Sequence, residues 1–366
     1  MQRQINEFIE MSKRTMESFL SKERKNIVVV AYYPTYRKHY GELLVRLKEK
    51  YNVIIVVERV LGDAFESSGH HNLYFPWRVM EDGQTYYLNM DVDGIDLILT
   101  ADEVGYEDGR IDRTFLSTKA KRVYFPHSLI EQTGASDVVD YILVPSKIAM
   151  ESFKNALKNS RVKLLESGYP KLDAAINSYA YQDSNTITYA PSLRYFSGDN
   201  ASLNLFSGFE NAMVESLLEL TDYKISYRAH PMNFQNHHTF YNLIKARWQN
   251  ESRVSFDEQL GNAFCNFSDF LVTDFSTTAF TYSFTTLRPS LFFTPLKLES
   301  HLAKYISSGG GAKFVAKRII KRSIEVLDFN RDYSRIKKFR DENVYNIGAS
   351  VNVIMEQIDA ILKESL

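Results

Sequence analysis

The chain has 366 residues, of which 24% are charged and 44% hydrophobic, a balance that excludes a disordered or fibrous protein. Its length predicts two domains, each large enough to bury its own core. The 44 Lys and Arg residues nearly balance the 45 Asp and Glu residues, and a net charge of -1 argues against nucleic acid as a partner.

The first 25 residues predict an amphipathic helix, because apolar residues recur at helical spacing among basic ones. We expect this helix to dock on its own domain, with contact to a partner or a membrane as the alternative. The segment lacks the apolar run of a signal peptide, and no stretch of about 18 apolar residues predicts a membrane-spanning helix. The single cysteine, Cys265, fits a reducing compartment. We therefore expect a cytoplasmic protein.

Residues 26–167 predict a first α/β domain, because short β-branched runs alternate with helical patterns as in a parallel sheet. A crossover helix is expected at 41–51, and a hairpin at 74–90 turns at 81–84. The expected strands lie at 26–31, 53–57, 95–100, 122–125 and 141–144.

Residues 168–340 predict a second domain of the same Rossmann-like kind, with helices at 203–220 and 234–248. The stretch 333–366, which includes a C-terminal helix at 341–366, is mostly helical by period, and we expect it to pack back on the first domain. Two parallel-sheet domains of this kind would face a cleft. The expected strands of the second domain lie at 186–190, 223–228, 253–256, 270–273 and 290–293.

Charge is distributed unevenly along the chain. Residues 58–112 contain 13 acidic and 3 basic side chains, which is typical of solvated surface and argues against nucleic acid there. Residues 297–340 contain 12 basic and 4 acidic side chains, which would attract phosphates or an anionic membrane surface. Ordinary helix surface is an equally good interpretation of this basic stretch.

The strongest local pattern is 268–280, an apolar strand that runs into Thr273-Asp274 and then a hydroxyl-rich turn before a helix. Such a helix start at the carboxyl end of a parallel strand offers backbone N–H groups to a phosphate, and Ser276, Thr277 and Thr278 would add hydroxyl donors. Asp274 would orient the turn rather than touch phosphate. A capped helix without a ligand is the alternative.

Three further strand ends carry polar side chains. In 227–231, Arg228 and His230 precede Pro231. The imidazole of His230 could donate to a phosphate oxygen, and we expect Arg228 beside it to bind the donor as well. In 189–194, Ser192 and Arg194 offer a hydroxyl and a guanidinium that could bind phosphate bidentately. In 124–128, His127 ends a strand of the first domain. Across the cleft from His230, it could be the general base that deprotonates an acceptor hydroxyl. Structural turn histidines are the alternative.

Several nucleotide- and metal-binding motifs are missing from the sequence. It has no Gly-x-x-x-x-Gly-Lys-Ser/Thr loop, no Gly-x-Gly-x-x-Gly fingerprint after the first strand, no Gly-x-Ser-x-Gly elbow and no His-Glu-x-x-His helix. No metal and no cofactor is therefore predicted.

Taken in order, these motifs resemble the CDP-glycerol glycerophosphotransferase family of teichoic-acid primases and polymerases, over about residues 120–290. The family pattern is a Gly-x-Pro-Arg-x-Asp segment, a Tyr-Ala-Pro-Thr-x-Arg strand, an Arg-x-His-Pro turn and a Ser-Asp-x-x-x-Thr-Asp-Tyr-Ser-Ser segment ending near Arg-Pro. The matching stretches are 168–173, 189–194, 228–231, 268–277 and 288–289.

The resemblance implies the two-domain GT-B fold and donor pyrophosphate binding by His230, Ser276 and Thr277, with His127 as the proposed base. Three positions depart from the pattern: Ser128 replaces the glycine after the base, Thr277 replaces the second serine, and Thr281 replaces a usual aspartate.

The resulting first hypothesis is a metal-independent transferase that moves glycerol phosphate or a related polyol phosphate from a CDP-linked donor. The acceptor would be a hydroxyl of a cell-surface polysaccharide, a teichoic-acid-like polymer or a lipid-linked precursor, with peripheral attachment to the inner face of the cell membrane. One alternative is a GT-B glycosyltransferase of capsule or surface glycan synthesis that uses CMP-Kdo, CMP-sialic acid or a UDP-sugar. Another is a binding protein that retains the cleft without catalysis.

Overall fold

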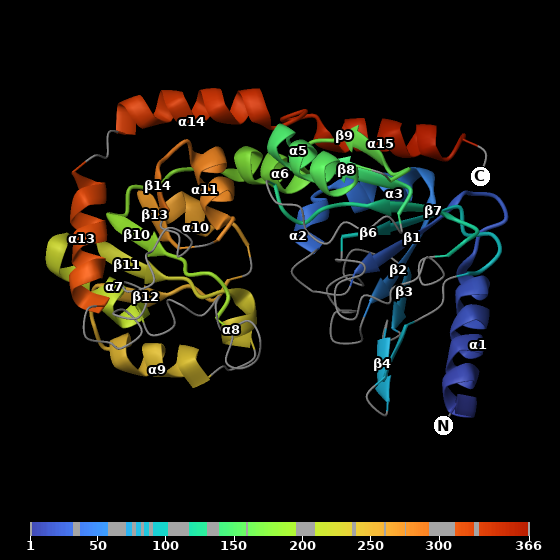
Figure 1. Cartoon of the computed structure of the whole chain (residues 1–366), viewed down its shortest axis with the longest axis horizontal. Helices are drawn as coiled ribbons and strands as arrows, with labels where there is room; N and C mark the ends of the chain where they lie inside the picture. The colour runs from blue at the N-terminus through green and yellow to red at the C-terminus, as the bar shows by residue number, and fades with distance from the viewer. Residues whose placement is uncertain are drawn as a thin grey trace. The chain divides into compact units, whose positions relative to one another are not determined.

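The computed structural model folds into two α/β units (Figure 1). Unit 1 contains Met1–Ala174 and Asn343–Leu366, and unit 2 contains Ala175–Glu342. Unit 1 is therefore built from two separate stretches of chain, with unit 2 between them. The structure describes residues 2–31, 37–57, 71–74, 78–81, 84–87, 91–101, 117–129, 139–158, 160–194, 209–235, 239–259, 261–274, 276–292, 312–325 and 329–364.

The sheet of unit 1 joins seven of the described strands in the order β3-β2-β1-β6-β7-β8-β9, and every neighbouring pair is parallel. All five predicted strands are confirmed, whereas β3 and β9 were not predicted. The bounds are β1 (Asn26–Ala31), β2 (Asn52–Val57), β3 (His71–Tyr74), β6 (Leu97–Thr100), β7 (Lys121–Tyr124), β8 (Tyr141–Val144) and β9 (Lys163–Glu166).

The predicted hairpin is also confirmed, as β4 (Arg78–Glu81) paired antiparallel with β5 (Gln84–Tyr87). The remaining elements of unit 1 are helices. They are α1 (Gln2–Phe19), α2 (Arg37–Tyr40), α3 (Leu43–Lys50), α5 (Lys147–Ala156), α6 (Pro170–Ser178), which runs on into unit 2, and α15 (Ser350–Ile361).

Both faces of the unit 1 sheet are buried, as the continuous apolar strands predict. Val28 and Val30 lie in one core, which also takes Met16 and the flanking Phe19 at the end of α1. This end of the N-terminal helix therefore docks on its own unit. Ile27 and Val29 alternate with these two valines in β1 and are buried as well. Buried residues also include Leu97 and Leu99 of β6, Leu43 and Leu47 of α3, and Ile354 and Ile358 of α15.

Unit 2 has a five-stranded parallel sheet in the order β12-β11-β10-β13-β14. Its strands are β10 (Thr186–Tyr189), β11 (Lys224–Tyr227), β12 (Val254–Phe256), β13 (Phe270–Thr273) and β14 (Ser290–Phe292). Its helices are α7 (Phe209–Leu220), α8 (Pro231–Gln235), α9 (Thr239–Trp248), α10 (Phe264–Phe267), α11 (Thr278–Thr286), α13 (Ala312–Ile324) and α14 (Phe329–Asn343).

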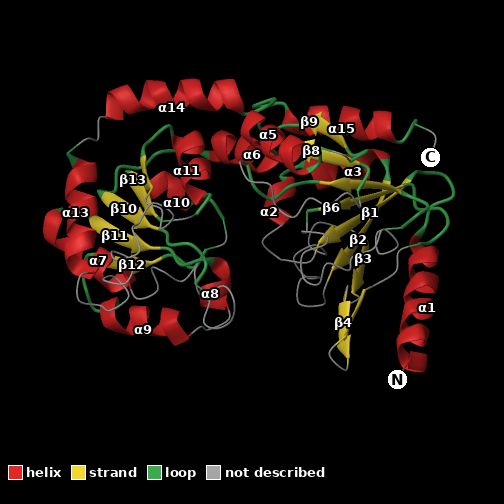
Figure 2. Cartoon of the chain, viewed as in Figure 1, coloured by secondary structure: helices red, strands yellow, loops and turns green. Residues whose placement is uncertain are grey.

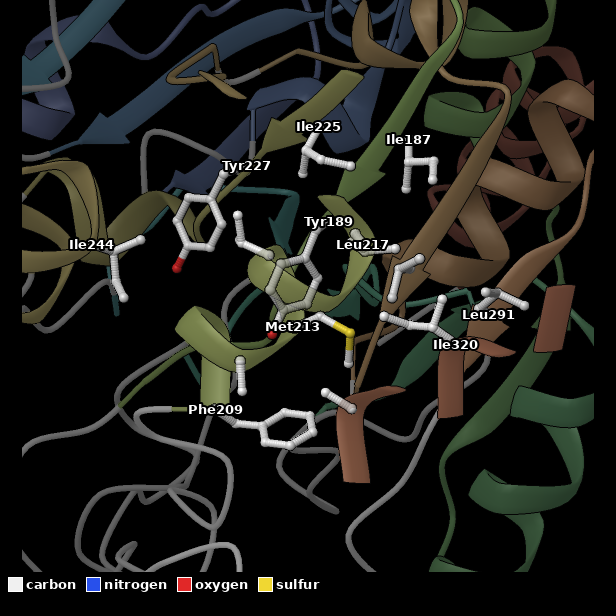
Figure 3. Close-up of a cluster of buried hydrophobic side chains, with 14 of the residues drawn as sticks. Ile187, Tyr189, Phe209, Met213, Leu217, Ile225, Tyr227, Ile244, Leu291 and Ile320 are labelled. Carbon is white, nitrogen blue, oxygen red and sulfur yellow. The ribbon is translucent and has the colours of Figure 1, made fainter. Parts of the chain in front are cut away.

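Helices cover both faces of this sheet (Figure 2). Phe270 and Val272 belong to the larger core, which Figure 3 shows around Tyr189, Met213 and Tyr227. Leu271, between them, packs on the other face with residues of α10 and α11. The predicted helix 203–220 corresponds to α7, and its first six residues lie outside the described ones. The predicted helix 234–248 corresponds to α9 preceded by the short α8, and 236–238 are not described.

The helical end of the chain divides between the units. Arg340 of α14 donates to the carbonyl oxygen of Phe284 at 3.0 Å, within unit 2. Lys50 of α3 bonds Asp359 at 2.5 Å and thereby ties α15 to unit 1. The expectation that the C-terminal segment packs back on the first domain is thus confirmed for α15, whereas α14 belongs almost wholly to unit 2.

Candidate active site

The predicted donor-binding residues follow three neighbouring strands of unit 2. β10 lies between β11 and β13, with Tyr189 paired to Tyr227 on one side and to Val272 on the other. The carboxyl ends of parallel strands share one edge of a sheet, so the segments that begin at Ala190, Arg228 and Asp274 emerge side by side. This edge brings together residues as far apart in sequence as Ala190 and Asp274.

A cluster of buried charged side chains lies at this edge. The guanidinium of Arg194 is 2% exposed, and its Nε lies 2.5 Å from Oε1 of Glu210, at the start of α7. Its Nη2 lies 2.6 Å from Oδ2 of Asp274, which is fully buried. Burial would lower the pKa of Arg194, but the charges of Glu210 and Asp274 raise it, so the guanidinium stays charged. Burial raises the pKa of Glu210 against the opposing effect of Arg194.

Asp274 and Asn233 extend this hydrogen-bond network to the loops that follow the strands. Asp274 accepts a hydrogen bond from the backbone N–H of Ser192 at 2.8 Å. Asn233, buried in α8, accepts from the N–H of Arg194 at 3.1 Å and donates to its carbonyl at 2.9 Å. The N–H of Asn233 in turn donates to the carbonyl of His230 at 2.8 Å. The segments after β10, β11 and β13 are therefore fixed to one another.

The geometry corrects the sequence-based roles of two arginines. Arg194 is enclosed by two carboxylates and cannot also grip a phosphate bidentately. Arg228 is similarly engaged: it pairs with Asp257, donates to the carbonyl of Gly261 at 2.8 Å and stacks its guanidinium 4.6 Å from the ring centre of Phe264. Both guanidinium groups therefore hold loops in place, which the sequence alone could not distinguish from ligand binding.

Five predicted donor-binding residues at the same three strand ends are half-buried, and we call them the layer: Ser192, His230, Ser276, Thr277 and Thr278. The Oγ of Ser192 accepts from Nη1 of Arg194 at 2.9 Å. Ser276 donates from Oγ to Oγ1 of Thr278 at 2.9 Å and accepts from the N–H of Thr278 at 3.2 Å. These bonds close a turn just before α11, where Thr277, the residue before the helix, makes no side-chain capping hydrogen bond. Asp274 accepts from the N–H of Ser192, and its role in capping or orienting the turn after β13 stays a prediction.

In unit 1, His127 follows β7, as predicted, and is half-buried. Its Nδ1 lies 3.4 Å from the carbonyl oxygen of Ala101, the residue after β6. Burial, with the nearby positive charges of Lys171 and Lys38, lowers the pKa of His127 to about 4 against the raising effect of the Ala101 carbonyl. The ring is therefore neutral near pH 7 and able to accept a proton.

A second histidine, His39 of α2, lies beside His127 and was not predicted. The two ring centres are 5.8 Å apart in an edge-to-face arrangement. The hydroxyl of Tyr169 lies 2.6 Å from Nδ1 of His39 and donates to the carbonyl of His127 at 2.6 Å. Burial and the charges of Lys171 and Lys38 lower the pKa of His39. In the sequence, the one signal for this histidine cluster was that Tyr169 lies inside the 168–173 motif.

The same motif also docks the C-terminal helix. Asp173 accepts from the N–H groups of Gly348 and Ser350 at 2.7 and 3.0 Å and from the hydroxyl of Ser350 at 2.5 Å, so it caps α15 from outside the helix. Gly168 has a φ of +85°, and a Cβ there would lie 2.6 Å from the carbonyl oxygen of Tyr345. Only glycine fits this approach.

Within the described residues, no three His, Cys, Asp or Glu side chains gather as metal ligands would. The helices among them include none that is both long and apolar enough to cross a membrane.

The chain is similar in structure to several solved enzymes, all at low sequence identity. The wall teichoic acid polymerase TagF soaked with CDPG matches with a TM-score of 0.55 and 15% identity, over 99% of this chain and 94% of that one. MnaA of Staphylococcus aureus bound to UDP gives 0.59 and 16%, over 92% and 97%. The UDP-GlcNAc 2-epimerase of Methanocaldococcus jannaschii with UDP-GlcNAc and UDP gives 0.56 and 11%, over 92% and 99%. These likenesses show a GT-B type fold.

A search of curated proteins found no match to the chain. The model of the CDP-glycerol:poly(glycerophosphate) glycerophosphotransferase family matches residues 115–299, which include His127 and every segment of the unit 2 edge. With half of its length matched and all the motifs in order, the chain belongs to this family of transferases.

Proposed function

We propose that the protein transfers glycerol phosphate, or a related polyol phosphate, from a CDP-linked donor to a hydroxyl group. The acceptor is a teichoic-acid-like polymer, another cell-surface polysaccharide or a lipid-linked precursor. One observation carries the proposal: a buried cluster of Arg194, Glu210, Asp274 and Asn233 fixes the three strand ends that carry the half-buried residues of the layer. The donor's pyrophosphate binds to this layer.

The hydrogen bonds within the layer indicate which O–H and N–H groups can donate to a phosphate. Since Ser192 accepts from Arg194, its own O–H proton can point outward, and the guanidinium polarises it. Ser276 donates to Thr278, which leaves the hydroxyl proton of Thr278 for the ligand. The dipole at the start of α11, which has nine residues, favours negative charge at the same place. His230 adds an imidazole N–H.

The proposed reaction forms one P–O bond and breaks another. The acceptor oxygen attacks the donor phosphorus that carries glycerol, and the bond to the bridging oxygen breaks so that CMP leaves with that oxygen. His127 takes the proton of the acceptor hydroxyl, while His230 and the α11 start stabilise the charge that develops on the leaving phosphate. The neutral state of His127 near pH 7 suits this role.

The test is a thermal-shift and calorimetric panel of CDP-glycerol, CDP-ribitol, CMP-Kdo, CMP-sialic acid, UDP-sugars and CMP. A ligand at about 100 times its Kd stabilises the folded state by about 2.7 kcal/mol, enough to raise Tm by several degrees. We expect CDP-polyols to give this shift in the wild type and in Ser252→Ala, an exposed control in unit 2. The shift is lost in His230→Ala and reduced in Ser192→Ala.

Other outcomes would change the proposal. Stabilisation by a nucleotide sugar and not by CDP-polyols would replace the transferred group with a sugar, and no stabilisation by any of them would overturn donor binding at this edge. Binding of CDP-glycerol without CMP release, when lipid-linked glycerol phosphate is supplied, would favour a non-catalytic binding protein.

We further propose peripheral attachment to the inner face of the cell membrane through α13. Lys313 and Lys317 on this helix pair with Glu215 and Glu219 of α7, so they are engaged within unit 2. Arg318, Lys321 and Arg322 are exposed. Each basic residue near an anionic membrane contributes about 1 kcal/mol.

Sedimentation with lipid vesicles tests the membrane proposal. The vesicles contain about 30% anionic and about 70% neutral lipid, to imitate an anionic leaflet. We expect Arg318→Glu with Arg322→Glu to weaken binding at least about tenfold. The matched control, Lys158→Glu with Arg161→Glu, reverses two exposed charges in unit 1. Equal binding by both double variants would contradict attachment through α13.

A further inference from the structure

The hydroxyl of Tyr169 connects two histidines that belong to different elements. Tyr169 is 2% exposed, and its oxygen lies 2.6 Å from the carbonyl oxygen of His127 and 2.6 Å from Nδ1 of His39. His39 lies in α2, after β1, and is 5% exposed. Both distances are those of strong hydrogen bonds, so this bridge fixes the backbone of His127 to the side chain of His39.

The chemistry of the bridge assigns the protons. A carbonyl oxygen can only accept, so the single O–H proton of Tyr169 must go to His127. The tyrosine oxygen then accepts from Nδ1–H of His39, which places the lone pair of a neutral His39 on Nε2. In the same way, the Ala101 carbonyl 3.4 Å from Nδ1 of His127 favours a proton on that nitrogen. The lone pair of His127 is then on Nε2, the atom that would accept the acceptor proton.

The backbone around the bridge is held closely. Gly41, directly after α2, has a φ of +52°, and a Cβ there would lie 3.0 Å from the carbonyl oxygen of Pro170. The segment carrying His39 therefore packs against the segment carrying Tyr169. The edge of one imidazole also meets the face of the other at 73°, which limits how far the His127 ring can turn.

The charged groups that act on the pair come from the same two elements. Lys38 precedes His39 in α2, and Lys171 follows Tyr169 in α6, and both disfavour protonation of either histidine. Tyr169 is itself buried, and its pKa is raised well above the ordinary value, so it remains a donor throughout the working range.

We propose that Tyr169 and His39 are positioning residues for His127: their hydrogen-bonded bridge sets the place of the base and, by limiting the turn of its ring, keeps Nδ1–H on the Ala101 carbonyl. This inference rests on the proposed function only in giving His127 the role of base. Neither residue is proposed to touch the substrate. The bridge acts by holding the His127 backbone and one side of its ring, so that Nε2 meets the acceptor hydroxyl in one orientation.

The experiment combines kinetics with a readout that needs no turnover. Tyr169→Phe and His39→Leu each break the bridge, and we expect kcat for CMP release from CDP-glycerol to fall about 10- to 100-fold with KM for CDP-glycerol changed less than about threefold. The acidic limb of the pH profile should also shift. His39→Asn keeps an N–H near the place of Nδ1 and should recover most of the lost rate. Tyr51→Phe, which removes a hydroxyl bound to Asp359 elsewhere in unit 1, is the matched control.

Nitrogen-15 NMR of histidine-labelled protein, with His127 assigned by its loss in His127→Asn, reports the tautomer and pKa of His127 directly. We expect Nδ1–H in the wild type and in Tyr51→Phe, and a mixture or a changed pKa in Tyr169→Phe and His39→Leu. Unchanged His127 signals in both bridge variants would overturn the positioning role, whatever the activity. If the wild type fails to use CDP-glycerol while the signals shift as expected, the proposed function fails and the bridge stands.

Discussion

The two candidate regions accommodate their buried polar groups in different charge states. At the unit 2 edge, full charges are buried and paired: Arg194 lies between Glu210 and Asp274. In unit 1, His39 and His127 are held neutral, because burial and neighbouring lysines depress their pKa values. The paired charges hold three strand ends in place, whereas a neutral ring retains a lone pair for a proton. The same kind of strand end thus supplies two different chemistries.

The largest effect should come from breaking the buried charge cluster. Arg194→Met leaves Glu210 and Asp274 buried without their cation, which typically costs about 3 to 5 kcal/mol of unfolding free energy. Urea denaturation at pH 7 measures this loss. Adding Glu210→Gln should recover part of it, because one of the two uncompensated carboxylates becomes neutral.

Arg46→Met is the control for that experiment, since Arg46 is 46% exposed and pairs with Glu49 at the surface. It should change stability by less than about 0.5 kcal/mol. An Arg194→Met protein as stable as this control would mean that the charge cluster does not hold the strand ends in place.

The second effect tests the neutral histidines through pH. The pKa of His127 falls from about 6.5 in the unfolded chain to about 4 in the folded protein, and that of His39 falls as well. As pH drops below about 6.5, the unfolded chain takes up protons first. The stabilisation is therefore complete above that pH and is lost as pH falls toward 4, by roughly 2 kcal/mol or more.

Unfolding free energies at about pH 7.5, 6.5, 5 and 3.5 measure this loss, because these values bracket the window of roughly 4 to 6.5. The double variant His39→Asn with His127→Asn should show a flatter dependence than the wild type. Parallel curves for the two proteins would show that the histidines titrate normally, and the contrast between the two regions would then disappear.

The smallest effect concerns the hydroxyl layer. Ser276→Ala removes the hydrogen-bonded turn that precedes α11 and should cost about 1 kcal/mol of stability, as loss of a single hydrogen bond does. It should also weaken CDP-glycerol binding severalfold, which calorimetry measures. Ser252→Ala, outside the layer, should do neither. If Ser276→Ala lost stability but bound the donor normally, Ser276 would only stabilise the turn.

The strands were predictable where the sheets bury them on both faces. Val28 to Val30 and Phe270 to Val272 form short apolar runs, and such runs mark the interior of a parallel sheet. β9 was missed because it is a half-exposed edge strand with Lys163 and Glu166 at its ends. Its short polar pattern does not differ from that of a loop.

Much of the unit 2 edge could be predicted, because hydroxyl and imidazole side chains directly follow apolar strands there. The direction of a guanidinium could not, so Arg194 and Arg228 were assigned to the ligand instead of to carboxylates 16 and 29 residues away. The bridge between His39 and Tyr169 spans 130 residues, and no local pattern relates them.

The capping of α15 by Asp173 has a consequence for the order in which the protein matures. Unit 1 begins at the start of the chain, yet its last helix is made only after all of unit 2 has been synthesised. Until then, Asp173 has no helix to cap and the Gly168 loop has no surface to pack on. Tyr169 lies between them, so the histidine cluster should be among the last features to become ordered on the ribosome, after the unit 2 edge has folded.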